Sequence, residues 1–392
     1  MGYAFEFESE IKPVSRQTDP PKSAYIHIPF CRSKCAYCDF NSYAGMESLW
    51  EAYVQALLKE MERAAKHGPL ETVYFGGGTP TVLPTGSLIH VLEAVAGFFG
   101  LSENAEISIE ANPGTVSKES LRELRKAGFN RLSLGVQSFN DDLLRRIGRI
   151  HTAKEAVATF DCARKAGFDN IGVDLIYSLP GQDLAGWEAD LRKLVNLGPE
   201  HASLYELTIC EDTPLGQEAL SGELAVPDGE AQVEMLLLGL RTLTKADYER
   251  YEISNYAKPG FACRHNQAYW RYEEYHGFGA GACSFVGGVR KSNVKWPKEY
   301  IERVIAGPSP VEFSEVPDEK QRVVEVLMLA LRTTEGLDLR AFERRLGYAL
   351  EDVHADKLAR MQERGLLTIA DGWLRPTDTG MLMADAIAAE FP

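Results

Sequence analysis

The chain has 392 residues, of which 45% are hydrophobic and 25% charged, and its formal net charge is -15. A chain of this size buries a large core and is expected to form one big domain with one or two smaller ones. The acidic balance and the missing Lys/Arg-rich run argue against nucleic acid as a partner. No apolar stretch is long enough to span a bilayer, and the N-terminus lacks a leader pattern, so we expect a cytoplasmic protein.

The first half of the chain alternates β-rich runs with amphipathic helical patterns. This alternation predicts repeated βα units and a parallel sheet. The expected strands are residues 24–28, 72–75, 106–110, 131–136, 170–176 and 202–207, and the expected helices include residues 49–66, 88–99, 154–166 and 184–197. Six units fall short of a closed eight-stranded barrel, so the predicted fold class is α/β with a partial (β/α)6, TIM-like barrel.

Three cysteines follow the first expected strand. Cys31, Cys35 and Cys38 stand in a C-x3-C-x2-C spacing with no fourth cysteine or histidine nearby. A structural zinc site needs four ligands, whereas three thiolates suit an iron-sulfur cube with one iron left open. A zinc loop and three buried thiols remain the alternatives. The other cysteines (Cys162, Cys210, Cys263 and Cys283) are scattered, which fits a reducing compartment.

Polar and glycine-rich segments follow the later strands. They include the glycine run at residues 76–78 together with Glu110, Gln137 and Asp174. Because the carboxyl ends of the strands open on one face of such a barrel, these segments are expected to converge there. Taken singly, each has an ordinary alternative: a tight βα turn for the glycines, and a hydrated rim charge for Glu110. Arg149 offers a guanidinium to the same face, or else caps a helix or pairs with Asp141.

After residue 214 the alternation stops. A helical stretch at residues 230–244 leads into an aromatic, glycine-punctuated region at residues 248–289, expected as a strand-and-loop extension. It contains His265, Asn266, Tyr269 and Trp270 in a His-Asn-x-x-Tyr-Trp motif. Aromatic faces beside a histidine suit a tetrapyrrole with an axial imidazole. Without context, a buried histidine bonded to its neighbours is the more frequent explanation.

The last part of the chain predicts three helices and a hairpin. The helical patterns cover residues 318–331, 339–345 and 353–364, and the hairpin covers residues 366–374 around Asp371-Gly372. A final helix follows. This pattern is typical of a winged-helix-like α+β domain, which either closes over the barrel mouth or offers a docking surface.

The cysteine spacing, with Tyr37 just before the last cysteine, resembles the signature of the radical S-adenosylmethionine (SAM) superfamily. This resemblance implies that SAM chelates the open iron of a [4Fe-4S] cluster and is split by an electron into a 5'-deoxyadenosyl radical. Over nearly the whole chain the likeness is to the coproporphyrinogen III oxidase-like branch, and within it to the heme chaperones. The oxidases carry a fourth cysteine where this chain has Phe40, and the chaperones carry the His-Asn-x-x-Tyr-Trp motif.

Site residues are implied by the same resemblance. The cluster ligands are Cys31, Cys35 and Cys38. The first SAM is assigned Tyr25, Tyr37, Gly77 and Glu110. The positions that match a second SAM site in the oxidase are Gly78, Thr79, Gln137, Arg149 and Asp174. The heme is assigned His265, Asn266, Tyr269 and Trp270.

The implied domains are an N-terminal extension (1–22), the radical SAM core barrel (23–213), the barrel extension (214–310) and the C-terminal domain (311–392). The implied function is that of a heme chaperone that holds a [4Fe-4S] cluster and SAM and passes heme to an acceptor protein. An electron donor to the cluster is a further expected partner. The alternative is an oxygen-independent coproporphyrinogen III oxidase, which turns propionates into vinyl groups.

Overall fold

A large open sheet forms the centre of the molecule. The computed structural model describes residues 20–64 and 68–391, so the expected extension at residues 1–22 lies almost wholly outside the described residues. Within them, twelve strands follow the order β14, β13, β12, β11, β1, β4, β5, β6, β7, β8, β10, β9. Their bounds are β1 Ser23–Ile28, β4 Leu70–Gly77, β5 Leu101–Ala111, β6 Arg131–Gln137, β7 Ile171–Tyr177, β8 His201–Glu206, β9 Glu249–Arg250, β10 Asn255–Ala257, β11 Tyr275–Phe278, β12 Cys283–Val286, β13 Val289–Asn293 and β14 Val311–Glu315.

The six expected strands are β1, β4, β5, β6, β7 and β8, and they pair in parallel in chain order. The predicted α/β fold with an incomplete barrel is confirmed. A seventh parallel strand, β11, joins the free side of β1, and β12 to β14 continue from it as antiparallel strands. The sequence assigned β14 to the C-terminal domain, and in the structure it pairs with β13 at the edge of the large sheet.

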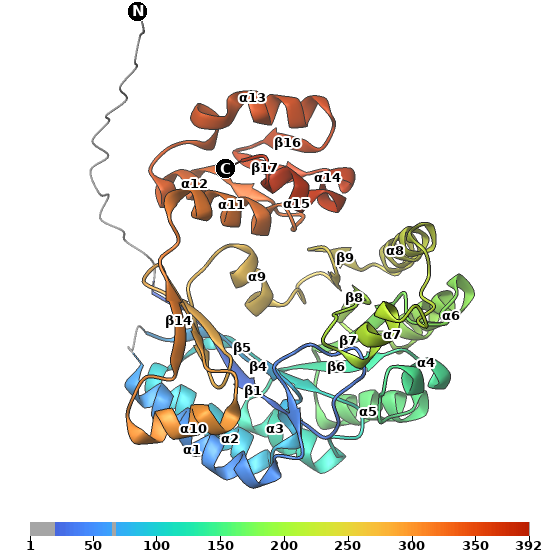
Figure 1. The fold of residues 1–392 in the computed structure, drawn as a ribbon, viewed down its shortest axis with the longest axis vertical. Coiled ribbons are helices and arrows are strands. Elements are labelled where there is room, and N and C mark those ends of the chain that lie inside the picture. The colour runs from blue at the N-terminus through green and yellow to red at the C-terminus, as the bar shows by residue number, and fades with distance from the viewer. Residues whose placement is uncertain (1–19, 65–67, 392) are drawn as a thin grey trace, which may run out of the picture.

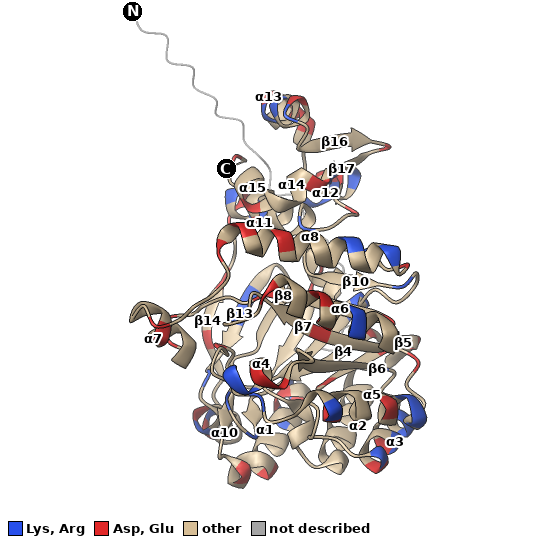
Figure 2. Cartoon of the chain, turned by 90° about the vertical axis from the view of Figure 1, so that its right-hand side faces the viewer, with Lys and Arg blue, Asp and Glu red and all other residues tan. Residues whose placement is uncertain are grey.

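Helices cover the outer side of this sheet (Figure 1). They are α1 Trp50–Arg63, α2 Thr85–Phe99, α3 Lys118–Ala127, α4 Asp141–Arg146, α5 Ala153–Ala166, α6 Leu184–Leu197, α8 Gly229–Lys245 and α10 Pro297–Ala306. Helix α7 (Pro214–Leu220) instead projects from the rim of the barrel (Figure 2). The short helix α9 (Arg264–Trp270) lies on the opposite side, between the sheet and the C-terminal unit (Figure 1).

Local signals set the ends of these helices, as α5 illustrates. It begins with a capping box in which Thr152 and Glu155 satisfy each other's backbone N–H groups. It ends at Gly167, which takes the left-handed conformation with φ of 95°. The expected helix at residues 154–166 is therefore found almost to the residue.

A buried carboxylate ties the sheet extension to the barrel. Glu60 on α1 accepts hydrogen bonds from Gly279 N (2.9 Å), Asn293 Nδ2 (2.6 Å) and Tyr300 OH (2.5 Å). These donors come from the loop after β11, from β13 and from α10. Burial raises the pKa of Glu60 to about 7, although the three hydrogen bonds oppose the shift. One side chain thus holds three separate segments of the extension.

The C-terminal unit contains α11 Glu319–Ala330, α12 Leu339–Leu346, α13 Leu350–Glu363, α14 Asp378–Leu382 and α15 Ala384–Ala388. A small sheet of β15 (Leu337–Asp338), β17 (Trp373–Pro376) and β16 (Leu367–Ala370) accompanies them. The expected hairpin is present, because Asp371 and Gly372 have φ of 55° and 79°, as a two-residue turn of the primed type requires.

This unit packs on the sheet extension and on α9. Tyr272 and Phe285, which belong to the extension, are buried in the core of the C-terminal unit. Tyr272 OH donates to Glu325 Oε2 at 2.7 Å, and Arg290 Nη2 lies 2.7 Å from the same oxygen. An apolar contact and a half-buried ion pair therefore join the two parts, at the edge of the sheet that β11 to β14 form.

Charge is spread over the outer helices. In the view of Figure 2, acidic and basic residues alternate along the ribbon. The chain has 42 basic and 57 acidic residues, which give the net charge of -15. Among the described helices, none is both long and apolar enough to cross a membrane.

Candidate SAM and cluster site

The cysteine loop is anchored at both ends and in its middle. Its first residues form β2 (Phe30–Cys31), which pairs with β3 (Tyr43–Ala44) after the loop. Between them, Ala36 N donates to Ile147 O at 3.0 Å, and Leu215 N donates to Ala36 O at 3.0 Å. The loop is thus tied to the segments that follow β6 and β8, and it spans the carboxyl-end face of the barrel.

Each of the three sulfur atoms has a polar neighbour. Burial raises the pKa of the Cys31 and Cys38 thiols, so metal binding there releases protons. Cys31 Sγ lies 3.5 Å from Thr79 Oγ1, Cys38 Sγ lies 3.9 Å from Ser42 Oγ, and Cys35 Sγ accepts from Arg149 Nη1 at 3.5 Å. Three thiols with one guanidinium and two hydroxyls nearby are a donor set that fits an iron-sulfur cluster.

In the described part of the chain, no three His, Cys, Asp or Glu side chains converge tightly enough to hold a single metal ion. A cubane cluster binds each of its thiolates through a different iron. Its ligands accordingly have no need to meet at one point.

The glycine run passes directly beside the cysteine loop. A Cβ on Gly78 would lie 2.6 Å from the carbonyl oxygen of Phe30 and 3.0 Å from Cys31 Sγ. Gly77 has φ of 116°, and a Cβ there would meet the ring of His27 at 2.6 Å. Only glycine fits this close approach, which leaves backbone N–H and C=O groups facing the loop.

We expect Gly78→Ala to lower the cluster content of the protein. Its methyl group would push β2 and Cys31 out of place, at an overpacking cost of about 1–3 kcal/mol. Iron and sulfide per chain, measured after anaerobic reconstitution, check this. Gly86→Ala on α2 is the control, since a Cβ there meets nothing within 4 Å. Equal iron content in the two variants would contradict the expectation.

Glu110 lies at the end of β5 and is half-buried. Its Oε1 accepts from Tyr74 OH at 2.8 Å, and its Oε2 accepts from Gly77 N at 3.3 Å. Burial raises the pKa of Glu110 to about 7, with the Tyr74 hydrogen bond opposing the shift and Asp174 adding to it. The carboxylate is therefore joined to the glycine run by a hydrogen bond, as expected.

Tyr25 and Tyr37 are also half-buried near this face. Burial raises the pKa of both phenols. The charge of Glu110 adds to the shift at Tyr25, and Cys35 and Arg149 act on Tyr37. Tyr25 therefore lies on the glycine side of the site, and Tyr37 lies on the cysteine side.

Arg149 links the cysteine loop to two strand ends. Besides Cys35, it donates to the side-chain oxygen of Asn112 and to the carbonyl oxygen of Gly135. Asn112 in turn donates to Thr79 Oγ1 at 2.7 Å. The alternative pairing with Asp141 is not what the structure has, because Asp141 Oδ1 accepts from Ala153 N at 2.7 Å.

Gln137 and Asp174 lie on neighbouring strands of the same face. Gln137 has φ of 70° at an irregularity in the pairing of β6 with β7. Asp174 lies inside β7, where Ser133 Oγ donates to it at 3.1 Å. Burial raises the pKa of Asp174, and hydrogen bonds from Ser203 and Ser133 oppose the shift. Both side chains thus belong to the barrel interior, with Gln137 nearer the rim.

Tyr74 and Asn112 are site residues that the sequence reasoning missed. Tyr74 stands two residues before the glycine run, on the inward face of its strand. Asn112 stands two residues after Glu110 in a Glu-Ala-Asn-Pro segment at a strand end. Both positions carry a signal, because polar side chains at strand ends point to the active face of a barrel.

His265 lies at the other end of the strands, and it is almost wholly buried, with 1% of its surface exposed. Its Nδ1 lies 2.8 Å from Thr72 Oγ1, and its Nε2 lies 2.8 Å from Tyr269 OH. The backbone N–H groups of Arg264 and His265 donate to Glu106, which caps the start of α9. Both ring nitrogens are therefore engaged, and this geometry favours the structural alternative for the histidine.

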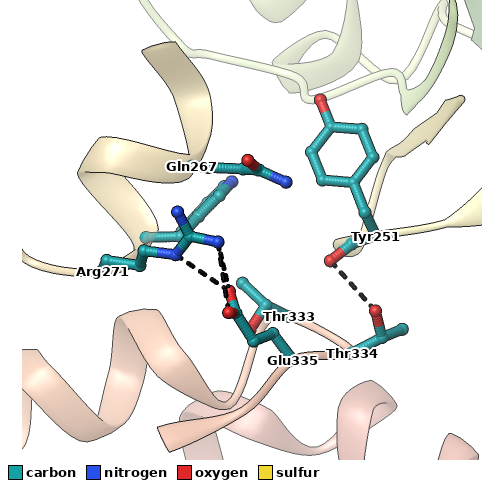
Figure 3. Close-up of a pocket in the computed structure, with 7 residues that line it drawn as sticks. Tyr251, Gln267, Arg271, Thr333, Thr334 and Glu335 are labelled. Atoms are coloured by element: carbon teal, nitrogen blue, oxygen red, sulfur yellow. Dashed lines mark hydrogen bonds and ion pairs between the residues drawn. The ribbon is translucent and has the colours of Figure 1, made fainter. Parts of the chain in front are cut away.

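A cavity of about 310 Å³ opens on the outer side of α9 (Figure 3). Its lining comes from the end of α9, from the segment between β9 and β10 and from the loop between α11 and β15: Tyr251, Gln267, Trp270, Arg271, Thr333, Thr334 and Glu335. Arg271 and Glu335 form an ion pair at 2.9 Å across it. The motif thus has an inner side, which binds the strands, and an outer side, which faces this cavity.

Comparisons with known proteins agree with this architecture. The family model of the radical SAM superfamily matches residues 25–194, and that of the HemN C-terminal domain matches residues 318–383. The solved structure of coproporphyrinogen III oxidase (HemN) from Escherichia coli superposes with a TM-score of 0.83. It covers 96% of this chain and 91% of its own at 24% identity, so the likeness concerns the fold.

Curated relatives are similar over almost the full length. The heme chaperone HemW of Bacillus subtilis is 37% identical over 374 residues, which cover 94% of this chain and 99% of the relative. HemW of Escherichia coli is 36% identical, covering 95% and 98%. HemW of Synechocystis is 40% identical, covering 81% and 79%. On this similarity, the chain belongs to the HemW family within the radical SAM superfamily.

Proposed function

We propose that this protein is a heme chaperone. It binds heme, holds a [4Fe-4S] cluster with SAM, and transfers the heme to an acceptor protein, with an electron donor as a second partner. A reducing, cytoplasmic setting is part of the proposal, because the cluster ligands must stay reduced thiols. The observation that carries the proposal is the similarity to several proteins named heme chaperone HemW, at 35–40% identity over 81–95% of this chain.

The cysteine loop is proposed to hold the cluster through Cys31, Cys35 and Cys38. A bound cluster would supply one-electron reduction and one open iron for a chelating ligand. Around it, Glu110 offers a hydrogen-bond acceptor, and the Gly77 backbone offers both a donor and an acceptor, to the ammonium and ribose groups of SAM. The rings of Tyr25 and Tyr37 would line the site on either side. Gly78, Thr79, Gln137, Arg149 and Asp174 form the set that a second SAM would need.

The heme is proposed to contact the outer side of α9. Trp270 borders the cavity there, and its buried indole nitrogen has no hydrogen-bond partner within the described structure. An aromatic face with the Arg271 guanidinium beside it suits a porphyrin ring and a propionate. Asn266 is half-buried on the same helix. His265 and Tyr269 bond to each other, so heme ligation by His265 would require both of its hydrogen bonds to break.

Heme titration of the full-length protein tests this proposal. We expect a saturable shift of the heme absorption band at one heme per chain. Trp270→Ala should weaken binding about tenfold, since the aromatic contact is worth roughly 1.4 kcal/mol. His265→Ala should keep the stoichiometry. Absence of saturable binding would refute the chaperone function. Loss of binding in His265→Ala, with binding kept in Trp270→Ala, would instead assign His265 as the heme ligand.

The oxidase is the second candidate, and one observation favours it. The chain matches the fold of the Escherichia coli oxidase over 96% of its length, and its interior offers the polar set for a second SAM. An anaerobic assay with reductant, SAM and coproporphyrinogen III separates the two functions. Formation of protoporphyrinogen would overturn the chaperone proposal in favour of the oxidase.

A further inference from the structure

The inner side of α9 is connected to Glu110 by a continuous series of side-chain contacts. The connection begins at His265 and passes through Tyr74 to the carboxylate, which the Gly77 backbone binds from the other side. His265 and Glu110 belong to segments far apart in sequence and to opposite ends of the barrel interior. The motif that distinguishes this chain is therefore in indirect contact with the proposed SAM site.

The first contact holds the imidazole in one orientation. Thr72 Oγ1 and Tyr269 OH each lie 2.8 Å from one ring nitrogen. Burial lowers the pKa of His265 to about 3, and nearby Arg131 acts in the same direction. A neutral imidazole has one donor and one acceptor nitrogen, and here both are used. The ring cannot turn without losing a buried hydrogen bond.

The second contact is a stack of rings. The ring of His265 lies 5.2 Å from the ring of Tyr74 at an interplanar angle of 24°, and 6.4 Å from that of Tyr25 at 29°. The two tyrosine rings lie 6.1 Å apart at 25°. Rings at these separations restrict each other's rotation. The position of the Tyr74 ring is therefore set on one side by the histidine.

The third contact acts on the carboxylate itself. The hydroxyl of Tyr74 donates to Glu110 Oε1 at 2.8 Å, and a hydrogen bond to the ionised form lowers the pKa of a carboxyl group. The other groups that act on Glu110 are the Gly77 N–H and Arg131, which favour its ionised form, and Asp174, which disfavours it. Tyr25 also faces the carboxylate. Within this set, Tyr74 is the side chain that donates directly.

We propose that His265 is a positioning residue for the SAM site, acting through Tyr74 on the orientation and charge of Glu110. The proposal rests on the function proposed above, in which Glu110 binds a group of SAM. The His-Asn-x-x-Tyr-Trp motif then serves two ligands: its inner side supports the nucleoside site, and its outer side faces the cavity proposed for heme.

Equilibrium dialysis of SAM against the anaerobically reconstituted protein, from pH 6 to 9, tests the proposal. In the wild type, affinity should rise with pH through about 7, as Glu110 ionises, and then level off. Tyr74→Phe should move this curve to higher pH and weaken binding about tenfold at pH 7, because a hydrogen bond to a charged group is lost. His265→Ala should shift the curve in the same direction.

A double substitution distinguishes positioning from general damage. If His265 acts through Tyr74, then Tyr74→Phe/His265→Ala should bind SAM no more weakly than Tyr74→Phe alone. Thr72→Val removes the hydrogen-bond partner of His265 Nδ1 and tests the same contact if His265→Ala fails to fold. It should also raise the midpoint of the curve of SAM affinity against pH. His90→Ala on the exposed side of α2 is the matched control.

Two results would overturn the proposal: a His265→Ala or Thr72→Val protein with the wild-type midpoint and affinity, or fully additive effects of the Tyr74 and His265 substitutions. If the wild type itself binds no SAM while its cluster is intact, the SAM assignment of Glu110 fails, and the inference fails with it. Heme stoichiometry, followed in the same variants, should stay unchanged.

Discussion

Cys38→Ala is expected to abolish the cluster. With two thiolates left in the loop, the cubane loses one of its three attachments, and iron should fall from about four per chain to less than one. Iron and acid-labile sulfide, determined after anaerobic reconstitution, measure the effect. Because SAM is proposed to chelate the open iron, retention of SAM in dialysis should fall as well.

Cys162→Ala is the matched control, since Cys162 lies on α5 on the outer side of the sheet. It should keep full iron and sulfide content. Near-equal amounts of iron and sulfide in the wild type would exclude the zinc alternative. One zinc per chain without sulfide, or an unchanged iron content in Cys38→Ala, would contradict the cluster assignment.

Glu60→Leu is expected to destabilise the protein by about 3–5 kcal/mol. The change leaves Gly279 N–H, the Asn293 amide and the Tyr300 hydroxyl without their common acceptor, and each unmet buried donor costs about 1–3 kcal/mol. Urea unfolding, followed by circular dichroism, measures the effect. Glu62→Leu on the exposed side of the same helix is the control and should stay within about 0.5 kcal/mol of the wild type.

The same residue predicts a pH dependence. Burial raises the pKa of Glu60 from 4.5 to about 7 in the folded protein, so the folded state holds this proton more tightly than the unfolded state. The contribution of Glu60 to stability is therefore greatest below pH 4.5 and declines until about pH 7, by about 3 kcal/mol. The Glu60→Gln side chain does not titrate. The free energy of unfolding of this variant should therefore fall short of the wild-type value by more at pH 5 than at pH 8. An equal deficit at both values would contradict the assigned shift.

Much of the barrel follows from local sequence signals. The strands ending near Glu110 and Gln137 alternate apolar residues with polar or small ones. The glycine run and the cysteines stand at strand ends, where parallel topology brings them together. Helix ends such as Thr152 and Gly167 carry capping signals that act within a few residues. These features depend on short-range chemistry, and the structure agrees with them closely.

Other features depend on contacts between distant segments. Strand β11 pairs with β1 because the chain returns to that edge of the parallel sheet after β10. No local sequence pattern predicts this pairing. The role of His265 depends on Thr72 and Glu106, which belong to two different strands. From the motif alone, an aromatic segment with a histidine looks the same whether its ring binds iron or a neighbouring hydroxyl.

The guanidinium of Arg149 serves Cys35, Asn112 and Gly135 at once. More negative charge on the sulfur, as an arriving electron would bring, strengthens one of these bonds at the expense of the other two, because all three draw on the same cation. The ends of β5 and β6 would then respond to the oxidation level of the metal centre. With a cluster bound, Arg149 would thus couple the charge on Cys35 to the backbone at the ends of β5 and β6.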